Sequence, residues 1–245
     1  MAYRFRKPEL IPTIALIITV ALMMKLGFWQ LDRLHWKLDL LATIEKAQSE
    51  APRDFVSFSE EELPKSEWHN VIVTGTLVND KELHAMPRYL HDEMGYAIFT
   101  PLKVATPAGD EYVLVNRGWV KPALKDAESR AQSNPAAPVR VEGVIRLPHP
   151  RKWPQPDNDP QKNIWFWYDL PAMAEHTGLK LLPVMIDATK LTLADGTQIK
   201  DGPSPFPLEV SIRNDHLGYA FTWFLLGLCA VGVYAAYYLE KTDRK

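Results

Sequence analysis

The feature that most constrains this chain is an apolar run near its C-terminal end. The stretch "LGYAFTWFLLGLCAVGVYAAYYL" covers residues 217–239 without a single charged side chain. At about 1.5 Å per helical residue, such a run is long enough to cross a bilayer core of about 30 Å. It therefore predicts a transmembrane helix over residues 215–239.

A second apolar run lies near the other end of the chain. Residues 10–24 carry no charge, and the run reaches spanning length only by continuing through Lys25 to Trp29. The long stem of Lys25 lets its ammonium group reach the membrane interface, where Phe28 and Trp29 suit an aromatic belt. No small-x-small cleavage site follows the run, so we expect an uncleaved transmembrane helix over residues 10–29 rather than a signal peptide.

The distribution of basic residues predicts the orientation of both spans. The positive-inside rule places clusters of Lys and Arg on the cytoplasmic side of a membrane. We therefore expect residues 1–9 and 240–245 in the cytoplasm and residues 30–214 across the membrane. The short segment before the first span has no room for an organelle transit peptide, which favours a bacterial inner membrane and a periplasmic domain. The flanking basic residues are Arg4, Arg6, Lys7, Lys241, Arg244 and Lys245.

The segment between the spans has the pattern of one helix followed by many strands. Leucines recur at helical spacing over residues 30–50, and Pro52 ends that helix because proline cannot continue its hydrogen bonds. Short runs rich in valine, isoleucine and aromatic residues then alternate with turn residues. A short helix over residues 168–179 is expected late in this pattern. The strand-like runs are residues 70–78, 81–86, 95–106, 111–120, 139–147 and 181–189.

Together these patterns predict the fold class, a membrane protein of α+β type with two transmembrane helices flanking a mainly β extracytoplasmic domain. Few helices and six or seven short strands favour a small twisted sheet or a partly closed barrel. Hairpin turns are expected at "TPAGDEY" and "LADGTQI". Roughly 180 residues are enough for one sizeable hydrophobic core without disulfides.

The motifs that the chain lacks exclude several functions. The single cysteine, Cys229, lies in the second apolar run, so there are no paired thiols for copper delivery, redox exchange or covalent haem attachment. Motifs of serine hydrolases and of phosphate-binding loops are also missing. The carboxylates follow no catalytic pattern, and the net charge is −2. We therefore expect neither an enzyme nor a nucleic-acid-binding protein.

Two motifs of the central segment combine aromatic and polar residues. "NIWFWYDL" contains four consecutive aromatic residues, which indicate either core packing or a surface for a flat hydrophobic ligand or a partner protein. In "VNRGWV", Gly118 permits an unusual backbone angle or a close approach. Arg117 beside it is able to bind a carboxylate through two hydrogen bonds, or to pair with a nearby Asp or Glu and hold the fold.

The most informative histidine stands at the start of the second span. If the helix begins at Asn214 or Asp215, His216 lies in its first turn, and Tyr219 and Trp223 follow on the same face. An imidazole at this position is able to coordinate haem iron, or simply to anchor the helix at the interface. The same face contains two small residues, which let a flat ring or another helix approach closely; they are Ala220 and Gly227.

Four motifs, in this order, resemble the Surf1 (Shy1) family of cytochrome c oxidase assembly proteins. They are "LGFWQLDRLHWK", "VNRGWV", "PDNDPQKNIWFWYDLPAMA" and "RNDHLGYAFTWF", and the resemblance covers essentially the whole chain. Family members are membrane proteins that help to mature subunit I of haem-copper oxidases, and bacterial members are implicated in haem a handling. The residues that match the first three motifs are Gly27, Trp29, Gln30, Arg33, Asn116, Arg117, Gly118, Trp119, Asn163, Trp165 and Asp169.

The resemblance implies a protein that binds haem a transiently and assists its insertion into subunit I. Its partners would be subunit I, haem a synthase and membrane lipid. The competing function is a haem-free scaffold that stabilises subunit I or the synthase. By the resemblance His216 is the ligand of the haem iron, with Tyr219 and Trp223 below it, and the propionates would meet Arg213, Arg117 or Arg33.

The neighbour of this histidine bears on its chemistry. Asp215 stands where the family commonly has an asparagine. A carboxylate there would favour a protonated imidazole, which does not bind iron, or would orient a neutral ring through its second nitrogen.

Overall fold

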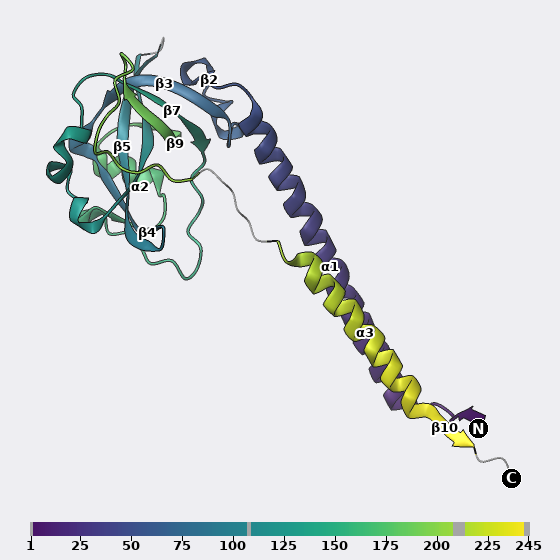
Figure 1. Cartoon of the computed structure of the whole chain (residues 1–245). Coiled ribbons are helices and arrows are strands. Elements are labelled where there is room, and N and C mark those ends of the chain that lie inside the picture. Colours follow the sequence, from purple (N-terminus) through teal and green to yellow (C-terminus); the bar gives the residue numbers. More distant parts are fainter. Residues whose placement is uncertain (1, 107–108, 208–213, 243–245) are drawn as a thin grey trace. The chain divides into compact units, whose positions relative to one another are not determined.

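The computed structural model describes residues 2–106, 109–207 and 214–242. Contacts between residues divide the chain into two compact units. One unit consists of the two end segments of the chain, and its N-terminal segment ends at Thr43. We call it the helical unit. The other begins at Ile44, and we call it the β domain. Figure 1 labels the helices and strands of both.

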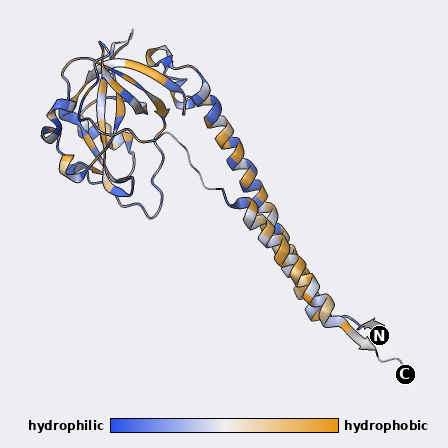
Figure 2. Cartoon of the chain, viewed as in Figure 1, coloured by the Kyte–Doolittle hydropathy of each residue, from blue (hydrophilic) through white to orange (hydrophobic). Residues whose placement is uncertain are grey.

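Helix α1 (Leu10–Ser49) is one continuous helix of 40 residues, which covers both the first predicted span and the helix predicted after it. At about 1.5 Å per residue it is about 60 Å long, roughly twice the thickness of a bilayer core. Apolar residues dominate its first half, and charged residues join them in the second (Figure 2). The side-chain amide of Asn70 closes its last turn by donating to the carbonyl oxygens of Gln48 at 2.6 Å and Glu50 at 3.0 Å.

Helix α3 (His216–Tyr238) lies within one residue of the second predicted span at each end. Both α1 and α3 are long and apolar enough to cross a membrane, judged by length and composition. Asp215 occupies the N-cap position of α3, but its side chain does not cap the helix. Two short strands that the sequence pattern did not predict, β1 (Ala2–Phe5) and β10 (Leu239–Thr242), pair antiparallel next to the helices.

Within the helical unit, α1 and α3 run antiparallel and pack closely (Figure 1). A Cβ atom added to Gly27 would collide with the ring of Phe224, so a larger residue there would displace that ring. The same ring packs edge-on against Phe28, with 5.5 Å between ring centres. An added Cβ on Gly227 would lie 3.5 Å from the Cβ of Met23. Small residues thus let the two helices approach closely.

Polar contacts hold the other end of this helix pair. The backbone N–H of Glu9 donates to the hydroxyl of Tyr238 at 3.1 Å, and the hydroxyls of Thr13 and Tyr234 share a short hydrogen bond. Sliding one helix along the other by one turn, about 5.4 Å, would break both contacts. The register of the pair is therefore specified by polar contacts as well as by the fit of apolar residues.

The β domain is built on one sheet that closes into a barrel. Five strands pair in the order β3–β7–β9–β6–β5, and β5 returns to β3 through the pairs Thr76–Lys103 and Leu77–Leu102. The sheet continues to β2 on one side, and to β4 and β8 on the other. The domain is thus mainly β and partly closed, as predicted. The strands are β2 (Arg53–Asp54), β3 (Asn70–Leu77), β4 (Leu83–Leu90), β5 (Glu93–Thr106), β6 (Gly109–Val120), β7 (Val139–Arg146), β8 (Ile164–Trp165) and β9 (Leu181–Leu193).

Two hydrophobic cores lie on the two faces of this sheet, because alternate residues of a strand point to opposite sides. Val113 and Val115 of β6 belong to the core inside the barrel, whereas Leu114 between them belongs to the core on the outer face. Helix α2 (Leu170–Thr177) contributes to the outer core. It ends at Gly178, which has the left-handed conformation typical of a helix C-terminus.

The aromatic motif "NIWFWYDL" does not form one continuous strand. β8 ends at Trp165, which is fully buried in the outer core, and the chain then bends. Asn158 holds the bend: its side-chain oxygen accepts from the N–H of Phe166 at 2.8 Å, and its amide donates to the carbonyl of Trp167 at 3.2 Å. The burial of Trp165 supports core packing for the motif, and the contacts of Asn158 tie the preceding segment to it.

Gly118 has the special backbone geometry that its motif indicated. Its φ is +119°, and an added Cβ would collide with the carbonyl group of Ser204. The close approach lets the N–H of Trp119 donate to the Ser204 carbonyl at 2.7 Å, and the N–H of Ser204 donate back at 2.8 Å. Glycine is therefore required both for its conformation and for its size.

The contact between Met23 and Gly227 allows a direct test of the helix pair. In a Cys229→Ser background, Met23→Cys/Gly227→Cys should form an intramolecular disulfide on mild oxidation, because the two Cβ positions are 3.5 Å apart and disulfides need about 3.5–4.5 Å. Mass spectrometry after alkylation counts the remaining thiols. The matched control keeps Cys229, which is exposed, and adds only Met23→Cys. A disulfide in the control, or none in the double variant, would contradict the antiparallel register.

Alanine at Gly118 should destabilise the β domain more than alanine at Gly196. Both glycines have a positive φ, +119° and +91°, but only the side chain at 118 would meet a neighbour. We expect a loss of about 1–2 kcal/mol in the free energy of unfolding for Gly196→Ala. Gly118→Ala should cost a further ~1–3 kcal/mol, because the chain at Ser204 must move. Denaturant unfolding of the detergent-purified protein, followed by tryptophan fluorescence, measures both; equal losses would show that the close approach does not matter.

Candidate functional site

The first residue of α3 carries the candidate ligand. His216 is half-buried, and its ring nitrogen Nδ1 lies 2.7 Å from the side-chain oxygen Oε1 of Gln30 on α1. An amide oxygen only accepts hydrogen bonds, so Nδ1 is the donor of this pair. A neutral ring with its proton on Nδ1 keeps a lone pair on Nε2, and such a nitrogen is a metal ligand.

The residues that follow His216 on α3 have two different environments. Ala220 is only 1% exposed and Gly227 is also buried, with Gly227 lying against α1. Tyr219 is 56% exposed, and Trp223 is half-buried. The small residues therefore serve the approach of another helix. The aromatic residues, at helical spacing from the imidazole, remain partly open to a ligand.

An aromatic and basic cluster lies on α1 close to Gln30. The guanidinium carbon of Arg33 is 5.8 Å from the ring centre of Trp29 and 5.6 Å from that of Trp36, within the range of cation–π attraction. Both tryptophan side chains are about half exposed. Arg33 follows Gln30 by three residues, so it lies about one helical turn from the partner of His216.

The other two arginines named from the sequence lie elsewhere. Arg213 falls outside the residues that the structure describes. Arg117 belongs to the β domain, where its side chain is fully buried. Its guanidinium donates to the side-chain oxygen of Asn134 at 2.8 Å and to the carbonyl of Ser133, and it lies 3.9 Å from the carboxylate of Glu82. Of the two roles that the sequence allows for Arg117, these contacts support the one that holds the fold.

Glu82 is the centre of a buried ionic cluster in the β domain. Its carboxylate, 5% exposed, binds the guanidinium of Arg130 and lies 2.9 Å from Nε2 of His84. Burial alone would raise the pKa of Glu82, but its hydrogen bonds to His84 and Arg130 outweigh that effect and hold the pKa below its usual value. Burial lowers the pKa of Arg117 to about 10 although Glu82 opposes the shift, so its guanidinium is still charged at neutral pH.

Sequence reasoning missed this cluster, since its members are far apart in the chain. Arg130 and Glu82 are 48 residues apart. Arg130 lies in a polar segment that forms the 3-10 helix η5 (Ala127–Ser133), and charged residues in such segments are normally solvated. Gln30 was named only as a motif residue, and its place in "LGFWQLDRLHWK" is the one signal that could have marked it.

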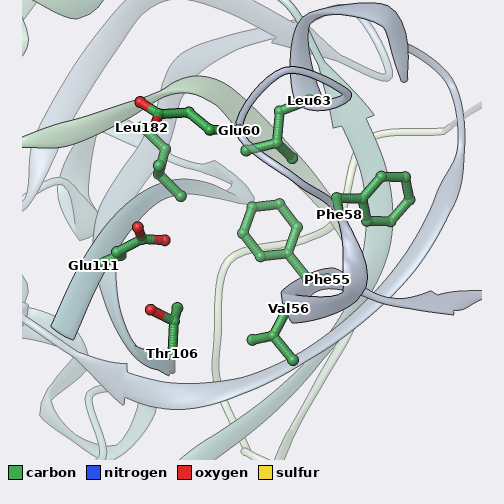
Figure 3. Close-up of a pocket in the computed structure, with 8 residues that line it drawn as sticks. All are labelled: Phe55, Val56, Phe58, Glu60, Leu63, Thr106, Glu111 and Leu182. Atoms are coloured by element: carbon green, nitrogen blue, oxygen red, sulfur yellow. The ribbon is translucent and has the colours of Figure 1, made fainter. Parts of the chain in front are cut away.

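Figure 3 shows a cavity of about 260 Å³ in the β domain. The ring of Phe55 points into it, and its wall includes the carboxylates of Glu60 and Glu111. Sites that enclose an organic ligand usually measure about 300–1,000 Å³. A small cavity with two carboxylates does not fit a haem, because its charges would repel the propionates.

A larger cavity, of about 460 Å³, lies next to the end of the "VNRGWV" motif. Trp119 and Phe206 supply aromatic walls, and Lys121 supplies a positive charge. Glu93 adds a negative charge to the same wall. Aromatic side chains are enriched in surfaces that bind partner proteins.

The chemistry of the available donors suits a haem better than a bare metal ion. Within residues 2–106, 109–207 and 214–242, no three His, Cys, Asp or Glu side chains come together as a metal site would need. A haem iron needs no such cluster, because the macrocycle supplies four nitrogen ligands and the protein only an axial one. In a ring that carries its proton on Nδ1, Nε2 of His216 is a nitrogen of that kind.

Comparison with known proteins gives a consistent result. A protein-family model described as the SURF1 family matches residues 17–228 of the chain. A SURF1-like protein from Monosiga brevicollis is 33% identical over 223 residues, which are 85% of this chain and 80% of that protein. Surfeit locus protein 1 from Xenopus tropicalis is 33% identical over 234 residues, 89% of this chain and 72% of that protein. Its counterpart from Gallus gallus is 35% identical over 220 residues, with 84% and 67% covered.

Removing the charge of Glu82 should destabilise the β domain strongly. Glu82→Gln leaves two buried guanidinium groups without a carboxylate, and breaking a buried pair in this way costs about 3–5 kcal/mol of unfolding free energy. The matched control is Glu142→Gln, whose carboxylate is 37% exposed and lies 3.4 Å from Arg140. Loss of such a surface pair costs about 0–1 kcal/mol. Denaturant unfolding of both variants compares them, and two equally small losses would contradict a structural role for the cluster.

The same carboxylate predicts how stability depends on pH. The folded-state pKa of Glu82 lies below 4.5, the value for an unperturbed glutamate. Its contribution to stability is therefore fully present above about pH 4.5 and is lost as the pH falls through the folded pKa. The unfolding free energy of the wild type should fall on acidification by more than that of Glu82→Gln. Parallel pH profiles for the two proteins would rule out this contribution.

Proposed function

The chain belongs to the SURF1 family, and from that premise we propose that it is an assembly factor for haem-copper cytochrome c oxidase. In this proposal the protein binds haem a transiently and assists its insertion into subunit I. The observation that carries the proposal is the imidazole of His216, whose Nδ1 is engaged by Gln30 while Nε2 keeps its lone pair.

Membrane insertion of the helical unit is the first part of the proposal. Length and apolar composition of α1 and α3 support it. So does the exposure of their large apolar side chains, which would stand in water if the unit were soluble. The basic residues at both ends of the chain support cytoplasmic termini. In this proposal the β domain lies on the opposite side, in the periplasm of a bacterial cell.

The haem cargo would then lie at the membrane surface. Haem a combines a large apolar ring and tail with two acidic propionates, so it suits the boundary between lipid and water. His216, as the first residue of α3, lies at that boundary in the proposed orientation. Tyr219 and Trp223 offer aromatic surface to the macrocycle, and Arg33 offers a positive charge to a propionate. Arg213, three residues before the imidazole, is a second candidate for that contact.

Transient binding suits a protein that delivers its cargo. A haem held by one imidazole and by apolar contacts is released more easily than one held by two protein ligands, since each lost ligand weakens the complex. We leave Arg117 out of the haem site, because Asn134 and Ser133 already bind its guanidinium inside the β domain.

The β domain would contact the protein partners, for which we propose subunit I and haem a synthase. The cavity of about 460 Å³ beside Trp119 supports a role in recognition, because its wall contains aromatic and apolar side chains, of the kind enriched in protein interfaces. The Glu82 cluster would keep the domain rigid for this purpose.

The hydrogen bond between His216 and Gln30 also favours a second candidate function, a haem-free scaffold. In that function the imidazole joins α3 to α1 and has no ligand. The β domain alone would then bind and stabilise subunit I or the synthase. Loss of oxidase after mutation of His216 does not separate the two functions, because both predict it.

The experiment that separates them is the haem content of the detergent-purified protein, produced together with the enzymes of haem a synthesis. We expect near-stoichiometric haem a in the wild type and less than about a tenth of it in His216→Ala. The matched control is His35→Ala, which removes an exposed histidine of α1 and should keep its haem. A wild type without haem would favour the scaffold. Haem retained in His216→Ala would keep the carrier function and reject this ligand.

A further inference from the structure

We propose that Gln30 is the positioning residue of the haem site: it accepts the Nδ1 proton of His216 and so presents Nε2 to the iron. The inference rests on the proposed function as far as haem is concerned. The hydrogen bond itself joins two side chains of this chain, with 2.7 Å between Nδ1 and Oε1. Its effect on the ring is therefore testable without cargo.

The position of Gln30 is set by the packing of the two helices. Gly27, one turn earlier on α1, lets the ring of Phe224 reach the backbone, and Phe28 packs against the same ring. These contacts hold the facing turns of α1 and α3 in one register. The amide of Gln30 therefore lies at a defined position along α3, opposite His216, because the packing of the two helices fixes it.

The chemistry of the acceptor determines the state of the imidazole. A histidine that ligates a metal usually donates its second N–H to an oxygen, which fixes both the tautomer and the orientation of the ring. A carboxylate in that role would draw the proton strongly and make the ring a stronger ligand. The neutral amide of Gln30 orients the ring without adding charge, so we expect a ligand of moderate strength, as a delivery protein needs.

The structure gives Nδ1 of His216 a partner other than Asp215. A carboxylate next to His216 could have been the group that orients the ring. In the structure, the hydrogen-bond partner of Nδ1 is Gln30 on the other helix. Residues that lie 186 positions apart in the chain thus make the contact.

The first test uses haem-free protein labelled with ¹⁵N at histidine. At a pH where the ring is neutral, the chemical shifts of His216 should show a protonated Nδ1 and a bare Nε2 in the wild type. Gln30→Leu, which removes the acceptor, should shift the ring toward the opposite tautomer. Gln30→Glu, which keeps an acceptor, should retain the protonated Nδ1. A wild-type ring with a bare Nδ1 would overturn the proposal, because the amide would then be donating.

The second test uses the haem-loaded protein. Gln30→Leu should weaken haem binding about ten- to a hundredfold, as loss of such a partner does in other metal sites. Gln30→Glu should keep the haem and lower its reduction potential, because a more basic imidazole favours the ferric iron. His35→Leu, an equal change of polarity at an exposed position of α1, should alter neither quantity. Haem affinity and potential unchanged in both Gln30 variants would overturn the proposal.

These readouts separate this inference from the proposed function. If His216→Ala keeps its haem, the ligand assignment fails and with it the role of Gln30 in haem binding, while the tautomer measurement still decides whether Gln30 orients the ring. If His216→Ala loses its haem and Gln30→Leu does not, the ligand stands and the positioning role fails. The Met23→Cys/Gly227→Cys disulfide, introduced with Cys229→Ser into Gln30→Leu, verifies that the helix pair is intact in that variant.

Discussion

The close contact between α1 and α3 is the constraint on which the candidate site depends. Gly27 and Gly227 bring the two helices near enough for side chains to interlock, and polar residues at the far end fix their register. Without this packing, nothing would bring Gln30 of α1 and His216 of α3 together. Packing of the two long apolar helices thereby gives the start of α3 one defined pair of polar side chains.

The β domain solves a different problem, the burial of charge. Glu82 lies between strands and the 3-10 segment that carries Arg130, and it compensates two buried guanidinium groups. Buried ion pairs seldom add much stability compared with apolar residues, but they are costly to break. The cluster therefore fixes how the polar connection that contains Arg130 packs against the barrel. Apolar packing alone would define that position less well.

The sequence predicts features that depend on local patterns. Uncharged runs indicate both long helices, and runs of valine, isoleucine and aromatic residues between turn residues indicate the strands. The glycine at position 118 indicates an unusual backbone conformation. Contacts between distant segments are a different matter. Gln30 with His216, and Glu82 with Arg130, form only when separate elements pair in space, and no periodicity within one element encodes that pairing.

Closure of the barrel also restricts how the β domain is able to meet other proteins. β3 and β5 pair with each other, and in the described part of the domain the sheet ends at β2 and β8, strands of only two residues each. Such short edges offer few unpaired N–H and C=O groups to a foreign strand. A partner that meets either of these two strands must therefore bind mainly through side chains, since β2 and β8 give an added strand almost no backbone to bind. The same shortness protects β2 and β8 from pairing with further copies of the domain.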